Sequence, residues 1–277
     1  WTDVQAGRQP YLRRFLDIAA ADPDARRYGF YFDVAMVHVY FGTQNVWNLI
    51  VETRGILEHY NLGHKPIWVD ETNASPTLDP LAPMSNPAYQ VKLEQQADYI
   101  VQAAALSLAA GAERFAVYRL YDDHYQPGSE TWGLVRADGT RRPAFTAYQT
   151  VIRLFSEATH ARHYWSDRSM LVVLRLPGQT AYVMWARQTE PVRFHIWASG
   201  VGDPATRISV SGLTREIEAA EVRHMESAWF VIDTPGALPD ESGSVMIQGS
   251  PVILVMDGPP HPVWVEVGGI RWQLTTG

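Results

Sequence analysis

The chain has 277 residues, of which 46% are apolar, and this composition supports a sizeable core divided over one or two domains. Its formal net charge of −7 and its lack of Lys/Arg runs argue against a nucleic-acid partner, and no apolar run reaches the roughly 18 residues that a membrane span needs. The sequence contains no cysteine, which excludes disulfides and thiolate catalysis.

The first half of the chain alternates between helical and strand patterns. Apolar residues spaced three and four apart predict helices, and runs of β-branched and aromatic residues predict strands. In chain order these elements are helix 11–21, strand 30–40, helix 46–60, strand 67–69, helix 88–110, strand 113–121 and helix 143–155. This alternation favours parallel strands joined by crossover helices. No glycine-rich loop follows a strand, so we do not expect a nucleotide site.

After about residue 158 the pattern changes to short alternating strands separated by Pro and Gly turns. These strands are predicted at 170–176, 181–186, 192–197, 207–210, 229–232 and 252–256. They indicate an all-β domain, and we expect a β-sandwich. Two further strands, 263–267 and 270–274, flank a two-glycine turn and predict a hairpin. We therefore expect three parts, at 1–157, 158–260 and 261–277.

Polar residues gather at the predicted carboxyl ends of the three parallel strands. His38 and Tyr40 lie two apart and project from one face. Asp70 and Glu71 close the next strand, and simple alternation turns Asp70 to the opposite face, where it would be a structural hydrogen-bond acceptor. The third strand ends in Tyr118, Arg119 and Asp122. Loop capping would explain one such end by itself, but three neighbouring ends predict a site at this edge of the sheet.

Three segments carry a resemblance to a known family. The runs at 32–40, 65–73 and 110–118 resemble strands six, seven and eight of the (β/α)8 retaining glycosidases of clan A. Gly133-Leu134-Val135 and Arg142-Pro143-Ala144-Phe145 resemble the segment between the eighth strand and the last helix of those enzymes. The resemblance covers about half the chain. It implies an α/β plus all-β fold, a partial TIM barrel of the last three βα units followed by a β-sandwich.

The resemblance also implies roles for individual residues. Glu71 matches the catalytic nucleophile, and His38 and Tyr40 match the His-x-Tyr pair that lines the sugar subsite. The family commonly has a Trp at the end of strand eight, whereas this chain has Tyr118, Arg119 and Tyr121 there, and Trp132 is a candidate substitute. The full set of expected substrate-binding residues is His38, Tyr40, Asn73, Tyr118, Arg119, Asp122 and Trp132.

The family's acid/base, a Glu after an Asn at the end of strand four, has no match in this sequence. Retaining hydrolysis needs a nucleophile and a second carboxylic acid about 5–5.5 Å away. We therefore expect a fragment that is inactive alone, except toward sugars whose leaving group needs no protonation, and whose partners are a carbohydrate and the missing N-terminal half of the barrel. The chain starts at Trp1 rather than Met, which suggests an internal start and leaves the location open, with an extracellular one favoured.

Two other functions remain open. A carbohydrate-binding protein could have kept the barrel and lost the chemistry, and the identity of the missing upstream acid would distinguish it from an enzyme. A metal-dependent hydrolase could use His38, Asp70 and Glu71, but no His-x-His or Glu-x-x-His spacing supports it. We expect no cofactor.

Overall fold

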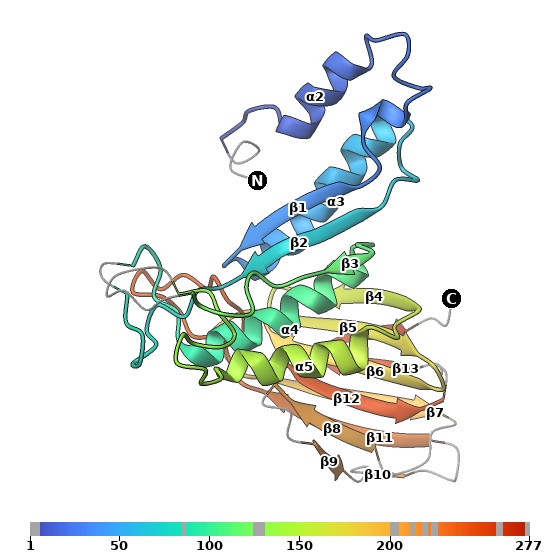
Figure 1. Cartoon of the computed structure of the whole chain (residues 1–277). Helices are drawn as coiled ribbons and strands as arrows, with labels where there is room; N and C mark the ends of the chain where they lie inside the picture. The colour runs from blue at the N-terminus through green and yellow to red at the C-terminus, as the bar shows by residue number, and fades with distance from the viewer. Residues whose placement is uncertain are drawn as a thin grey trace.

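The computed structural model describes residues 6–84, 87–123, 131–199, 205–210, 214–217, 221–222, 227–258 and 263–274. A three-stranded parallel sheet, a layer of helices and two antiparallel sheets follow one another through the molecule (Figure 1). Within these ranges, no helix is long and apolar enough to cross a bilayer.

The parallel sheet has the order β1 (Ala35–Tyr40), β2 (Ile67–Asn73) and β3 (Arg114–Phe115). Helix α3 (Thr43–His59) connects β1 to β2, and α4 (Leu93–Ala109) connects β2 to β3. Side chains alternate along the strands, so that one face is apolar and packs against the helices. That face carries Ala35, Val37, Val39, Ile67 and Val69, all of which are buried.

The remaining helical elements flank this unit. Helix α2 (Tyr11–Ala19) and the 3₁₀ turn η1 (Gly29–Tyr31) precede β1, and α5 (Pro143–Phe155) follows β3. Helix α5 begins with Pro143 in its first turn, where a missing N–H has no cost. Helix α4 is buried from Gln96 to Ser107 because it packs against β2 on one side and against α3, α5, β4 and β5 on others.

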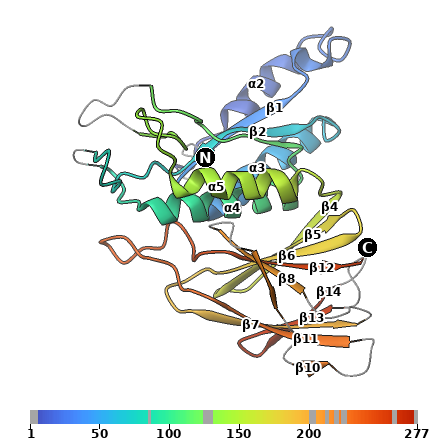
Figure 2. The same ribbon diagram turned by 60° about the horizontal axis from the view of Figure 1, so that its bottom comes forward.

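Antiparallel strands make up the rest of the structure, in two sheets. The six-stranded sheet has the order β4 (His160–Trp165), β5 (Ser169–Leu176), β6 (Gln179–Ala186), β12 (Val252–Asp257), β8 (Ala205–Ser209) and β9 (Thr214–Ile217). The five-stranded sheet has the order β10 (Glu221–Val222), β11 (Ser227–Thr234), β7 (Val192–Ser199), β13 (Val263–Val267) and β14 (Ile270–Leu274). Helices α4 and α5 lie against the six-stranded sheet (Figure 2).

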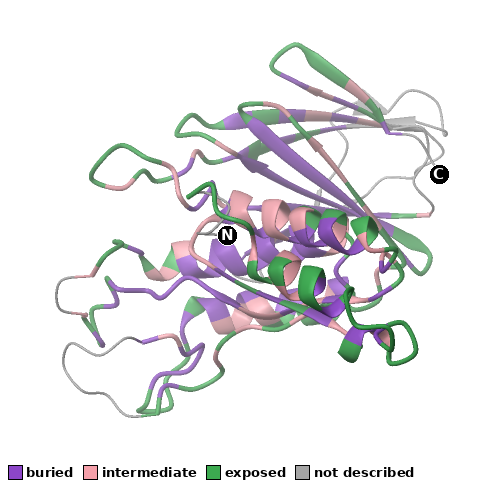
Figure 3. Ribbon diagram, turned by 90° about the horizontal axis from the view of Figure 1, so that it is seen from above, coloured by how far each residue is buried: buried purple, intermediate pink, exposed green. Residues whose placement is uncertain are grey.

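Strands β5, β6 and β12 of the six-stranded sheet are buried on both faces, which explains why β5 is apolar at almost every position. Val172, Val183 and Trp185 belong to the core shared with the helices. Leu171, Tyr182 and Met184 belong to a second core shared with the five-stranded sheet. Figure 3 shows the buried residues concentrated along these strands and the helices beside them, with exposed residues on the outlying loops.

Three predicted elements are shorter than expected. The strand predicted at 30–40 starts only at Ala35, because Phe30 and Tyr31 adopt left-handed backbone conformations with φ of 58° and 66°. The helix predicted at 88–110 starts at Leu93, where the Gln95 side chain accepts a hydrogen bond from the Lys92 N–H at 2.9 Å.

The strand predicted at 113–121 is the third. Only Arg114–Phe115 form the β3 ladder, although the N–H groups of Ala116 and Tyr118 still donate to β2. Beyond Tyr118 the chain turns away and pairs with residues 134 and 135.

The predicted C-terminal hairpin forms β13 and β14, and it lies inside the five-stranded sheet rather than beside it as a separate tail. Strand β13 pairs with β7, and Val265 and Val267 lie in the second core. Strand β4, which carries two His and one Arg among its six residues, was not predicted from the sequence.

Candidate active site

The two carboxylates at the end of β2 lie at a β-bulge. Val37 of β1 pairs with Val69, but the next residue, His38, pairs with Glu71, so Asp70 is an extra residue on β2. A bulge of this kind breaks the alternation of side chains. The expectation that Asp70 faces away from Glu71 was therefore wrong, because both carboxylates reach the same imidazole.

His38 bridges the two carboxylates. Its Nε2 lies 3.1 Å from Asp70 Oδ2, and its Nδ1 lies 3.3 Å from Glu71 Oε2. A neutral imidazole can donate to only one of the two carboxylates, whereas an imidazolium donates to both, so both contacts hold the ring only when it is protonated. Asp70 thus orients His38 against Glu71. The assumption that side chains alternate between the two faces of the strand could not predict this role.

Tyr40 provides a second contact to Glu71. The Tyr40 hydroxyl donates to Glu71 Oε2 at 2.6 Å, a length typical of a hydrogen bond to a charged oxygen. Burial, followed by this hydrogen bond, raises the pKa of Tyr40 far above its usual value, so the phenol stays a donor at any physiological pH. The Glu71 side chain remains 35% exposed and is accessible to a ligand.

An aromatic wall packs against Tyr40, the hydrogen-bond partner of Glu71. Trp132 meets Tyr40 edge-on with ring centroids 4.9 Å apart, and it contacts Phe41 at 5.3 Å. Phe41 in turn contacts Tyr89 at 4.8 Å. The sequence predicts Tyr40 and Trp132 as site residues but not Phe41 or Tyr89, because the latter two lie in loops without a recognisable pattern. Such a wall suits apolar ring faces that carry polar groups at their edges.

Asn73 lies beneath the site and not in it. Its side chain is fully buried, and its Nδ2 donates to the carbonyls of Tyr118 and Trp132, each at 2.7 Å. Its Oδ1 accepts from the Ala74 N–H and from Gln96. The structure therefore leaves no surface of Asn73 for direct sugar contact, contrary to the expectation, and gives it the task of joining the loops after β2 and β3.

Asp122 is also buried instead of lining the site. Its Oδ2 accepts from Arg142 Nη1 at 2.7 Å and its Oδ1 from the Gly133 N–H at 2.7 Å. Arg142 also donates to Asp79, and Arg136 binds the same carboxylate through two nitrogens. Burial raises the pKa of Asp79, but the hydrogen bonds from the two arginines outweigh it, so the net pKa is lowered. These ion pairs hold together the loops after β2 and β3, which flank the carboxylates of Asp70 and Glu71.

Tyr118 and Arg119 are partly exposed above β3. Their shared peptide bond is cis, and the Arg119 guanidinium lies 5.7 Å from the Tyr118 ring centre. Arg119 Nη1 also pairs with Asp123 Oδ2 at 2.5 Å. The structure thus brings His38, Glu71 and Tyr40 into direct contact and leaves Tyr118, Arg119 and Trp132 on the surrounding rim.

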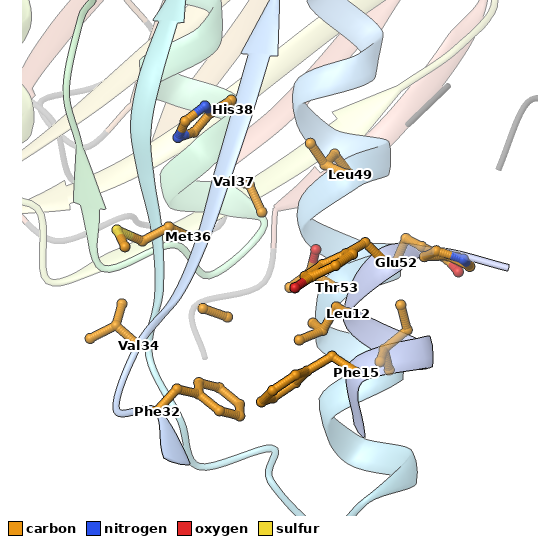
Figure 4. Close-up of a pocket in the computed structure, with 14 residues that line it drawn as sticks. Leu12, Phe15, Phe32, Val34, Met36, Val37, His38, Leu49, Glu52 and Thr53 are labelled. Carbon is orange, nitrogen blue, oxygen red and sulfur yellow. The ribbon is translucent and has the colours of Figure 1, made fainter. Parts of the chain in front are cut away.

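An apolar groove of about 400 Å³ runs beside β1, between that strand and helices α2 and α3 (Figure 4). His38 lies at one end of it, and at the other Phe15 and Phe32 meet edge-on with centroids 6.1 Å apart. Neither Glu71 nor Tyr40 lines this groove. Among the described strands, β1 pairs only with β2, so the groove borders a free sheet edge.

The arrangement does not resemble a metal centre. In the parts of the chain that the structure describes, no group of three or more His, Cys, Asp or Glu side chains is placed to hold a metal ion. His38 stands between Asp70 and Glu71, so an imidazole bridges the carboxylates at the position that a shared cation would need.

Solved structures give the comparison with known proteins. A family 39 glycoside hydrolase from the gut symbiont Bacteroides cellulosilyticus WH2 matches with a TM-score of 0.59 and 17% identity, over 84% of this chain and 46% of that one. A family 30 endoxylanase from Clostridium papyrosolvens C71 matches with a TM-score of 0.52 and 11% identity, over 91% of this chain and 55% of that one. The chain shares its fold with glycoside hydrolases.

The likeness is one of structure and not of sequence. No protein-family model and no curated protein sequence matches the chain. The chain spans about half the length of the two solved structures. At such low identity the likeness concerns the fold alone, and the chemistry must be argued from the residues.

Proposed function

We propose that this chain supplies the nucleophile of a retaining glycoside hydrolase, and that the nucleophile is Glu71. The observation that carries the proposal is a pair of contacts that position Glu71. Tyr40 and His38 both contact its Oε2 at the carboxyl end of a parallel strand. Active sites of (β/α)8 enzymes lie at this end of the strands. Because both contacts fall on Oε2, Oε1 is the oxygen that can approach an anomeric carbon.

The chemistry follows from that geometry. The Tyr40 hydroxyl stabilises an ionised Glu71 and fixes its plane, which a nucleophilic carboxylate needs before attack. Attack forms a covalent glycosyl ester and expels the leaving oxygen, which a second carboxylic acid must protonate. The same second group then removes a proton from water, which hydrolyses the ester with net retention. Asp70 supports this sequence by positioning His38.

We further propose that the acid/base comes from βα units beyond this chain. The two related structures are about twice as long, β1 has a free edge, and an apolar groove borders that edge. A free strand edge beside apolar side chains is a poor surface to leave in water. In this proposal residues 1–157 are the last three βα units of a TIM barrel. Residues 158–260, together with the hairpin at 261–277, form an accessory β-sandwich.

The rim residues then bind the sugar. Trp132 is half-buried against Tyr40, the hydrogen-bond partner of Glu71, and Tyr118 and Arg119 offer a phenol and a guanidinium for hydroxyl groups. Asn73 and Asp122 act indirectly, by fixing the loops that carry these residues. A carbohydrate-binding protein without catalysis would use the same wall, and the exposed aromatic rim is the observation that favours it.

An activated aryl glycoside is the discriminating substrate, because its leaving group needs no protonation and the missing acid contributes little to that cleavage. We expect the full chain to cleave one member of a panel of dinitrophenyl glycosides, and Glu71→Gln to abolish the cleavage. Glu113→Gln is the matched control, since Glu113 lies exposed at the opposite end of the sheet. Equal activity of the Glu71→Gln variant would refute the proposal, and sugar binding without any cleavage would favour the binding protein.

A further inference from the structure

A second group of aromatic rings lies where strand β4 meets helix α3. Trp165 is 54% exposed at the end of β4, and its ring stacks on His163 with centroids 4.6 Å apart and planes only 5° from parallel. The other partner of His163 is Trp47 of α3, at 3.6 Å. Trp165 is therefore held flat against a support and presents its other face outward.

The support is uncharged at neutral pH. Burial lowers the pKa of His163 to about 4, so the ring under Trp165 carries no charge above that pH. The three rings also limit one another's rotation, because Trp165 stacks on His163 while Trp47 packs against the same imidazole at a tilt of 43°. A ligand that lies on Trp165 would meet a surface that is already in place, which reduces the entropy lost on binding.

Polar groups border the stack on one side. Arg187 donates to the carbonyl of Ser166, the residue next to Trp165, at 2.6 Å, and to the Gln44 side chain at 3.1 Å. Gln44 donates in turn to Asn48 at 3.3 Å. The Arg187 Nε is buried and has no hydrogen-bond partner within the described structure. Amide and guanidinium groups beside a flat aromatic face are the chemistry that a sugar ring requires, with its apolar face and its peripheral hydroxyls.

Gln44 connects the surroundings of the stack to the end of β1 that carries the candidate site, because it accepts a hydrogen bond from Arg187. Gln44 follows Tyr40 by four residues, which limits the separation of their Cα atoms to about 15 Å. Both residues are at the carboxyl end of β1, where the chain enters α3. A long glycan with one unit at Glu71 would have to cover this span and the further distance from Gln44 to Trp165 to reach the stack.

We propose that Trp165, supported by His163 and Trp47 and bordered by Arg187 and Gln44, is a secondary binding site for a sugar unit of a polymeric glycan. The inference rests on the proposed function and deepens it, because it assigns a polysaccharide and not a small glycoside as the substrate. A structural role alone, shielding the free edge of β4, would not require the outward face of Trp165 to bind a ligand.

Affinity electrophoresis tests this site without any hydrolysis. The full chain carrying Glu71→Gln is run in native gels that contain soluble glucuronoxylan, mixed-linkage β-glucan, arabinan or porphyran. Trp165→Ala and Trp165→Phe are then added to the same background. Trp264→Ala is the matched control, because Trp264 is a partly exposed tryptophan on β13, in the outer sheet. Circular dichroism verifies that each variant is folded.

We expect at least one polysaccharide to retard the parent protein, which is the chain that carries Glu71→Gln alone. Adding Trp165→Ala should weaken that binding by about tenfold or more, the scale of losing one aromatic anchor. Trp165→Phe should keep most of the binding, and Trp264→Ala all of it. Equal retardation of the parent and Trp165→Ala would overturn the inference. So would the absence of retardation while the wild-type chain cleaves aryl glycosides, a result that leaves the proposed function intact. Absence of both retardation and cleavage would overturn the two together.

Discussion

Asp98 offers a quantitative test of how the helical layer meets the antiparallel sheets. It lies on α4, is 7% exposed, and accepts a hydrogen bond at 2.6 Å from Ser250, which lies just before Pro251 and β12. Burial raises the pKa of Asp98 to about 7; the Ser250 hydroxyl lowers it by less, and Glu94 raises it further. The folded protein therefore resists ionisation of this carboxyl. Asp98→Asn keeps the oxygen acceptor for Ser250 and removes the ionisation.

The expected effect has a definite size and sign. The pKa rises by about 3 units from 3.8, and each unit corresponds to about 1.4 kcal/mol, which gives ~4 kcal/mol in the free energy of unfolding. Below pH 3.8 the carboxyl is protonated in both the folded and the unfolded state, and the full stabilisation is present. As the pH rises towards 7, the unfolded state ionises first, and the wild type loses stability that Asp98→Asn retains.

Urea unfolding followed by tryptophan fluorescence measures this difference. The variant should match the wild type near the ordinary pKa of an aspartate, about 4, and exceed it by ~4 kcal/mol above pH ~7.5. The lowered pKa of His163 makes the stability of both proteins fall as the pH drops. This contribution is the same in wild type and variant, so it cancels when the two are compared at each pH. Glu58→Gln, which removes an exposed carboxylate on α3 that does not act on Asp98, should show no such trend. A variant less stable than the wild type at high pH, or a difference independent of pH, would refute the reasoning.

Three further changes probe the candidate site. Tyr40→Phe removes the hydrogen bond to the proposed nucleophile and should lower aryl-glycoside turnover by about 10- to 100-fold with an unchanged circular dichroism spectrum; full activity would contradict the assigned role. Arg142→Met leaves Asp79 and Asp122 buried with fewer partners and should destabilise the fold by ~3–5 kcal/mol in thermal unfolding. A loss below ~1 kcal/mol would show that this network of ion pairs is dispensable. In Gly133→Ala, a Cβ would lie 2.5 Å from the Val135 carbonyl oxygen, so the adjoining loop must move, and near-ultraviolet circular dichroism should report the displaced tryptophan; an unaltered spectrum would exclude that movement.

Local pattern was enough to locate the regular elements. The helix predicted at 143–155 matches α5, because its apolar spacing and its proline at the start are both local signals. Strands β5 and β6 were located by their apolar runs. The left-handed conformations at Phe30 and Tyr31 have no such signal, because bulky residues adopt them only where tertiary contacts impose them. Phe30 is buried in the core, which is such a contact.

The same limit applies to the candidate site. His38, Tyr40 and Glu71 could be grouped from the sequence because the ends of parallel strands coincide in space. The orientation of Asp70 could not, because the bulge that sets it depends on the pairing with β1. Asn73 and Asp122 look like surface residues in the sequence, yet their partners across the loops bury them.

Covalent trapping tests the central claim most directly. The full chain is incubated with dinitrophenyl 2-deoxy-2-fluoroglycosides, whose leaving group needs no acid catalyst and whose glycosyl esters hydrolyse slowly, and the digest is analysed by mass spectrometry. The proposal predicts one added fluorosugar on the peptide that contains Glu71, and none in Glu71→Gln. A fluorosugar on any other residue, or hydrolysis of the parent aryl glycoside with inverted configuration and no adduct, would contradict it.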